Sequence, residues 1–264
     1  MDFGTALAIY GGKDLLIKLL GPTFDYIGGT IKDNTERMCK NLGHIFSVAE
    51  KKLGEKINDE GKVPPKVLKD IINNGCWCED ELQAEYFGGI LASSRSEISR
   101  DDRGSYYSRI VDSLTTYQIR LHYLIYTELR ELFIGADHNI GDPSVRTQLE
   151  IFIPFRTYID AMDFSENEAH QFGSILQNSI WGLVNAGLVD NTFNFGSVEY
   201  VRKYYPKASD GGILLRPTTL GAELFLWAYG YGKSPMDVFF NPDAKLDRIN
   251  GIKISEGTVA TRKK

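Results

Sequence analysis

Several features of secreted, membrane-spanning and strongly basic proteins are missing from this sequence. Three cysteines in 264 residues cannot build a disulfide framework, and so few thiols are typical of a reducing cytosol. No run of about 20 apolar residues occurs, so we expect no transmembrane segment. Lys and Arg total 30 and Asp and Glu total 35, and this net charge of −5 argues against a surface that binds polyanions everywhere. The sequence therefore predicts a cytoplasmic protein.

Recognisable catalytic signatures are absent as well. The sequence has no GxSxG, GxxxxGKS/T or GxGxxG motif, which argues against serine hydrolases and the usual phosphate-binding loops. Cys76 and Cys78 flank Trp77 without the second ligand pair of a structural zinc site, so we expect buried free thiols. No histidine pair has HExxH spacing; the four histidines are His44, His122, His138 and His170. We therefore expect no metal and no cofactor, assign no catalytic residue, and favour a protein that is not an enzyme.

Apolar residues in the first half recur every three or four positions, which predicts an N-terminal helical domain over residues 1–135. The predicted helices run from Pro22 to about Glu55, from Pro64 to Gly75, from Glu79 to about Leu91, and from Tyr106 to Leu132. The last has the most regular spacing and is predicted to be one helix, in which His122 is a buried, hydrogen-bonded side chain. The glycine pairs 11–12, 28–29 and 88–89 lie in helical patterns, and close helix packing explains them better than phosphate binding.

The first twenty residues form the most apolar stretch at either end of the chain. They have no basic segment before the apolar run and no small-residue cleavage site, so we do not expect a secretory signal. Residues 3–20 instead have the pattern of an amphipathic helix that docks on the protein's own core. A peripheral membrane contact through residues 3–20 is the alternative, although the polar face has few of the cations typical of such helices.

The second half of the chain changes character after residues 135–144, a connector rich in Gly, Asp, Asn and Pro that we predict to be a domain boundary. Ser165 and Glu168 form a capping box at the start of a helix over residues 166–186, and Gly187 follows as its C′ residue. Leu188 and Val189 are predicted to begin one strand, and residues 213–216 form a second strand after a glycine-rich turn. Thr218 or Thr219 then caps a closing helix.

This order of elements predicts the fold class. Residues 145–232 have the helix, paired strands and closing helix of a winged-helix-like unit, and residues 233–264 resemble an irregular C-terminal tail. The protein is therefore predicted to be mainly α, with an N-terminal helical domain followed by a winged-helix-like α+β domain that contains a small β-hairpin.

A charged loop around residues 93–105 is the first candidate site. Its acids alternate with arginines, so a salt-bridge network that orders the loop is the favoured interpretation. Arginines also bind phosphates or carboxylates, and paired carboxylates bind divalent cations, so a ligand or partner site and a metal-dependent nuclease or hydrolase centre stay open. The candidate ligand or partner residues are Arg95, Arg100, Asp101, Asp102 and Arg103.

The wing between the two predicted strands is the second candidate. Residues 199–210 hold three cations against two acids, a net charge of +1, and interleave them with tyrosines. Such mixing suits single-stranded nucleic acid, whereas the helix over 166–186 has no Lys or Arg with which to neutralise DNA phosphates. A packing or protein-interaction surface is favoured, and the candidate nucleic-acid contacts are Arg202, Lys203, Tyr204 and Lys207.

Four stretches of this sequence resemble the Abi-alpha (abortive infection alpha) domain family of bacteria: LLGPTFDYIGG, KVPPKVL, EDELQAEYFGGILASS and LRPTTLGAELF. The resemblance covers roughly residues 15–230. It implies a cytoplasmic helical protein with a winged-helix-like end and a role in phage defence, and it implies no particular catalytic residues.

The sequence thus predicts a non-enzymatic interaction protein resembling an abortive-infection component, with a protein partner or self-association. The alternatives are a nucleic-acid-binding winged-helix regulator that acts through the wing, and a metal-dependent nuclease or hydrolase that uses residues 95–103.

Overall fold

The structure is a computed structural model that describes residues 36–78, 80–98 and 100–262. These residues form two compact units. The first comprises the described residues up to Ser113 together with Leu226–Lys233, and the second comprises Leu114–Phe225 and Ser234–Lys264. The division therefore differs from the expected one within residues 135–144. That connector belongs to the second unit, where the Gly135 amide donates to the Phe240 carbonyl at 2.9 Å.

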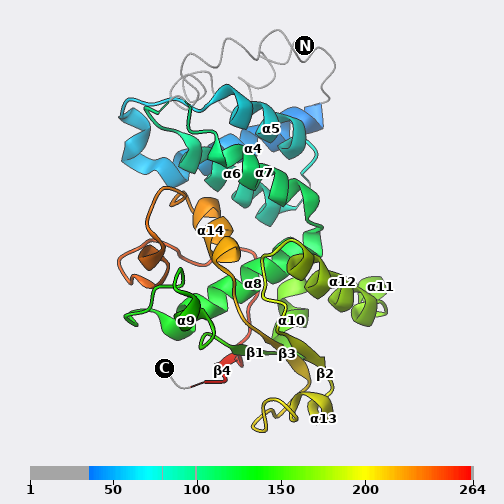
Figure 1. Cartoon of the computed structure of the whole chain (residues 1–264). Coiled ribbons are helices and arrows are strands. Elements are labelled where there is room, and N and C mark those ends of the chain that lie inside the picture. Colours follow the sequence, from blue (N-terminus) through cyan, green and yellow to red (C-terminus); the bar gives the residue numbers. More distant parts are fainter. Residues whose placement is uncertain (1–35, 79, 99, 263–264) are drawn as a thin grey trace. The chain divides into compact units, whose positions relative to one another are not determined.

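The first unit is helical, as predicted (Figure 1). Its elements are α4 (Glu36–Leu53), the 3-10 helix η2 (Gly54–Asn58), α5 (Pro65–Gly75), α6 (Glu81–Ser94) and α7 (Arg103–Ser113). The predicted helices over 64–75 and 79–91 are confirmed as α5 and α6, which begin at Pro65 and Glu81. Asp80 caps the start of α6, because its side chain accepts hydrogen bonds from the amides of Leu82 and Gln83. The remainder of the predicted 22–55 helix before Glu36, the segment 3–20 and the glycine pairs 11–12 and 28–29 lie outside the described residues.

Two adjacent glycines in α6 allow close packing, which confirms the interpretation of the pair 88–89. A Cβ atom on Gly88 would lie 2.4 Å from Cγ1 of Val48 on α4. A Cβ atom on Gly89 would lie 1.7 Å from the carbonyl oxygen of Ala228. Both distances are far below van der Waals contact, so the packing at these positions requires glycine.

The prediction of one helix over residues 106–132 is wrong. The chain forms α7, which ends at Ser113, and α8 (Thr116–Phe133), which starts again after Thr115. Thr115 and Gln118 form a reciprocal capping box: the Thr115 hydroxyl accepts from the Gln118 amide, and the Gln118 side chain accepts from the Thr115 amide at 3.0 Å. The apolar spacing continues across this break, which is why periodicity alone missed it.

Replacing Thr115 with alanine is expected to lower the free energy of unfolding by about 1 kcal/mol, because one α8 amide loses its capping acceptor. Thr116 is exposed and is the matched control, since Thr116→Ala removes the same atoms from the first helical position. Urea unfolding followed by circular dichroism measures both. Equal effects of the two substitutions would contradict the capping role.

The second unit contains the small sheet and the remaining helices. They are α8, α9 (Pro143–Arg146), β1 (Ile151–Pro154), α10 (Phe155–Met162), α11 (Glu166–Ala169), α12 (Phe172–Asn185), β2 (Asn194–Gly196), α13 (Val198–Val201), β3 (Gly212–Leu215), α14 (Thr219–Ala228, of which the residues from Leu226 belong to the first unit), η3 (Met236–Phe240) and β4 (Val259–Ala260). The sheet is antiparallel with strand order β2-β3-β1-β4 (Figure 1). Three helices between β1 and β2 (α10, α11 and α12), and a wing between β2 and β3, give the winged-helix-like arrangement expected from the sequence.

Several boundaries in this unit differ from the prediction. The strand predicted over 213–216 is confirmed as β3, but Val189 makes only an isolated bridge with Pro217, and β3 pairs instead with β2 on one side and β1 on the other. The capping box of Ser165 and Glu168 is confirmed, yet its helix ends after one turn, so residues 166–186 form α11 and α12. Strands β1 and β4 were not predicted: β4 has only two residues, and the four residues of β1 are apolar throughout and show no alternation.

Tyr126 and His122 on α8 connect that helix to the segments around α14. The Tyr126 hydroxyl donates to the Leu188 carbonyl at 2.6 Å and accepts from the Thr218 amide at 3.0 Å. His122 is fully buried with Nε2 3.0 Å from the Gly221 carbonyl, and this burial lowers the pKa of His122 to about 3. The ring is therefore neutral at physiological pH, as expected of a buried, hydrogen-bonded histidine. Thr218 caps α14 by accepting from the Gly221 amide.

The segment from residue 234, which we call the C-terminal arm, is more ordered than the predicted irregular tail. It contains η3 and β4, and β4 adds to the sheet beside β1. Arg130 of α8 is buried and donates to the carbonyls of Phe239 and Ala244. Arg248 of the arm forms ion pairs with Glu128 and Glu131. Within the described residues, no helix is long and apolar enough to cross a membrane.

Candidate functional site

The charged loop of the first unit is held by its own ion pairs. Asp101 accepts two hydrogen bonds from the Arg103 guanidinium, at 2.8 and 3.0 Å, and Asp102 accepts one from Lys66 at 2.6 Å. These cationic donors lower the pKa of both carboxyl groups. Arg95 donates to the backbone carbonyls of η2 and the following turn, at Lys56, Ile57 and Asp59.

Asp101 and Asp102 are thus already paired with neighbouring cations, which is the arrangement of a loop-ordering network. Arg100 is exposed on the loop. Among the residues that the structure describes, no group of three or more His, Cys, Asp or Glu side chains is placed to hold a metal ion. Cys39, Cys76 and Cys78 are buried free thiols, as predicted, and burial raises the pKa of Cys39 and Cys76.

The wing packs on one face of the sheet, which we call the outer face. Val201 and Ala208 from the wing form a buried cluster with Phe152 of β1 and Leu214 of β3, and Tyr205 packs against it. The strand register places Phe152 and Leu214 opposite each other on this face. The opposite face carries isoleucines and leucines that are almost completely buried: Ile151, Ile153, Ile213 and Leu215.

The candidate nucleic-acid contacts of the wing have separate roles in the structure. Arg202 donates from Nε to the Ala208 carbonyl at 2.8 Å, so it stabilises the turn of the wing. The ammonium of Lys203 lies 5.4 Å from the centre of the Tyr200 ring. Tyr204 is 54% exposed, and Lys207 is exposed beside it in sequence. Of the four candidates, Tyr204 and Lys207 line the hollows over the sheet.

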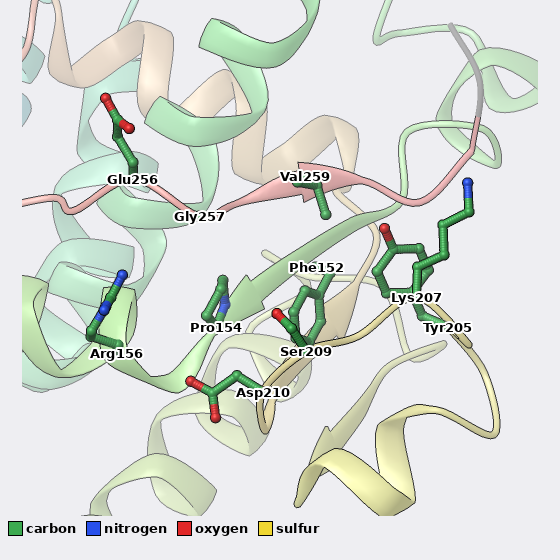
Figure 2. Close-up of a pocket in the computed structure, with 10 residues that line it drawn as sticks. All are labelled: Phe152, Pro154, Arg156, Tyr205, Lys207, Ser209, Asp210, Glu256, Gly257 and Val259. Atoms are coloured by element: carbon green, nitrogen blue, oxygen red, sulfur yellow. The ribbon is translucent and has the colours of Figure 1, made fainter.

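Three adjoining hollows lie over the outer face, and we call them together the outer groove. Their volumes are about 370, 490 and 300 Å³. The first and second share Tyr205 and Lys207, and the second and third share Glu150, Tyr204 and Arg262. Figure 2 shows the first hollow, where the rings of Tyr205 and Phe152 lie side by side, with centroids 5.6 Å apart, next to the strand that carries Val259.

Sequence reasoning missed three cations of the outer groove, because they lie outside the wing. Arg156 follows β1 on α10, Arg216 follows β3, and Arg262 follows β4. Each is separated from residues 199–210 along the chain and reaches the groove only through strand pairing. A cation within two residues of the end of each of three short strands is the one local signal that could have indicated them.

Helix α12 has the position that a recognition helix occupies in a winged-helix unit, but it carries no Lys or Arg. Its exposed side chains include Ser174, Gln177 and Trp181. The Trp181 ring packs edge-on against Phe193, with centroids 5.0 Å apart, and 47% of the residue is exposed. This helix therefore presents a polar and aromatic surface without the cations that duplex DNA requires.

Comparisons with known proteins assign this chain to no family. No protein-family model matches the chain. No curated protein and no solved structure shows significant similarity to it, and the resemblance to the Abi-alpha domain family therefore stays a prediction.

Proposed function

We propose that this chain is a non-enzymatic interaction protein whose winged-helix unit makes the contact. The observation that carries this proposal is a group of aromatic side chains around β2, the aromatic patch, consisting of the exposed Trp181, Tyr200 and Tyr204 and the half-buried Phe193. Exposed fractions are 47% for Trp181, 39% for Tyr200 and 54% for Tyr204. Large aromatic side chains left in solvent together are typical of binding surfaces, because they bury much area at a low cost in side-chain entropy.

The aromatic patch consists of two pairs of contacting rings that meet at one hollow. Trp181 packs against Phe193, Phe193 and Tyr204 line the same hollow, and the rings of Tyr204 and Tyr200 have centroids 5.6 Å apart. The patch therefore presents one continuous surface to a partner. The charged loop supports a hydrolytic alternative less well, because both of its neighbouring aspartates already accept hydrogen bonds from cations.

The resemblance to abortive-infection proteins supplies the biological context of this proposal, a role in phage defence in the bacterial cytoplasm. The decisive experiment is a phage-plating assay with cells that express the wild type, Trp181→Ala with Tyr204→Ala, or Arg100→Ala with Asp102→Ala. Expression of the three proteins is matched by immunoblotting. We expect the aromatic double variant to lose protection and the loop double variant to retain it.

The outcomes separate the candidate functions. Protection that is lost only in the loop variant would transfer the function to residues 95–103 and favour a ligand or hydrolase site there. Protection that both variants retain would refute the aromatic patch as the contact surface. If the wild type protects against no phage in the panel, the defence context is wrong.

A further inference from the structure

The outer groove combines aromatic rings with cations at one end. Tyr204 lies between the second and third hollows, and Phe193 lines the third. Lys207, Arg216 and Arg262 line the same two hollows, where Glu150 is the lining acid. The chain as a whole has a net charge of −5, so this end of the groove is a local excess of positive charge on an acidic protein.

We propose that the outer groove binds single-stranded nucleic acid, which makes a nucleic-acid strand the partner of the interaction protein proposed above and rests on that proposal. Bases stack on Tyr204 and on the neighbouring rings, and phosphates contact Lys207 and Arg262. Base stacking on an aromatic ring tolerates any sequence, because every base has a flat π face.

The hydrogen bonds of the groove leave Lys207 and Arg262 available to bind a ligand. Glu150 accepts from Arg216 at 2.9 and 3.0 Å and from the Thr261 hydroxyl at 2.7 Å, so its carboxylate and Arg216 neutralise each other. Lys207 and Arg262 are exposed and form no ion pair with an acid in the part of the chain that the structure describes. An anionic strand along this end of the groove therefore meets two cations and no free carboxylate.

The dimensions and the neighbouring helix favour a single strand over a duplex. The second and third hollows, at about 490 and 300 Å³, each have the volume of a pocket for one small molecule, roughly 300–1,000 Å³, and suit nucleotides that are bound one at a time. The first hollow is also lined by the acids Asp210 and Glu256, so the strand is expected to use the other two. A duplex would instead use α12 in the major groove, and α12 has no cation.

Fluorescence anisotropy with labelled oligodeoxythymidine, oligouridine and a DNA duplex tests the proposal. The wild type is expected to bind the single strands at low salt and to bind the duplex at least tenfold more weakly; the two single-strand arms distinguish DNA from RNA. Tyr204→Ala is expected to weaken binding about tenfold, the equivalent of one stacked base, whereas Tyr204→Phe retains the ring and the affinity. Thermal unfolding checks that each variant is folded.

Salt dependence tests the two cations independently. Lys207→Gln with Arg262→Gln is expected to make the slope of log K against log salt less steep by about 1.4, because two single-strand phosphate contacts are lost. The matched control is Lys69→Gln with Lys253→Gln, which removes the same charge from exposed positions outside the groove and leaves the slope unchanged.

Two results would overturn the assignment: a folded wild type that binds no oligonucleotide at low salt, or binding that survives both Tyr204→Ala and the loss of the two cations. Wild-type protein that protects cells but binds no oligonucleotide would refute the nucleic-acid partner alone. Aromatic-patch variants that still protect would refute the proposed function itself.

Discussion

Replacing Gly89 with alanine is expected to destabilise the first unit by about 3 kcal/mol or more. The new Cβ atom would lie 1.7 Å from the carbonyl oxygen of Ala228 and 2.2 Å from its carbonyl carbon. Both obstructing atoms belong to the backbone, so no side-chain rotation relieves the overlap. The packing around the nearby Ser93 side chain, which donates to the Trp227 carbonyl at 3.1 Å, has to shift as well. Overpacking in a dense core costs about 1–3 kcal/mol, and more when the backbone itself is obstructed.

Gly173→Ala is the matched control for this substitution. Gly173 also lies in a helix, α12, but no atom lies within 4 Å of the position of its Cβ. Alanine there is expected to stabilise the protein by up to about 1 kcal/mol, since glycine disfavours the helix. Urea unfolding curves give both values. A Gly89→Ala protein with the unfolding midpoint of the wild type would refute the close approach of the two backbones.

Replacing Arg130 with methionine is expected to cost about 3 kcal/mol or more and to release the C-terminal arm. Arg130 is 5% exposed, and its guanidinium donates to the carbonyls of Phe239, Asn241 and Ala244. Hydrogen bonds to a charged group contribute roughly 1.5–3 kcal/mol each, and methionine fills similar space without any donor. The expected result is a lower urea midpoint and rapid cleavage of the arm by a nonspecific protease.

Arg130→Lys distinguishes the geometry of the guanidinium from its charge. Lysine retains the positive charge, but its single ammonium cannot replace the planar group that reaches three carbonyls, so an intermediate loss is expected. Stability and protease resistance equal to those of the wild type in Arg130→Met would show that the arm is held elsewhere, for example by the Arg248 ion pairs.

Signals within a few residues of each other were read correctly from the sequence. The capping box of Ser165 and Glu168, the cap at Thr218 and the close packing at Gly88 and Gly89 are all confirmed. Each depends on a hydroxyl, a carboxylate or a missing Cβ atom that acts on the backbone nearby or on one neighbouring helix. Gly187 is confirmed for the same reason: its φ of 71° is the left-handed conformation expected at a helix C-terminus.

Helix length was overestimated where two consecutive helices bury the same side, because the apolar residues then keep one periodic pattern through both. The break at Thr115 was missed because the three-and-four spacing continues through it. The break between α11 and α12 was missed although the capping box before it was recognised. Periodicity reports which side of a helix is buried, and two short helices can bury the same sides as one long helix.

The outer groove and the division into two units came from the tertiary structure. Glu150, Arg216 and Arg262 are separated by dozens of residues and meet because β1, β3 and β4 lie in one sheet. Such strand pairings depend on long-range contacts that local propensity does not encode. Composition, caps and glycine spacing therefore determined the helical class and many local features. The neighbours of Arg216 and Arg262 in the outer groove depend on the strand pairing, which only the tertiary structure shows.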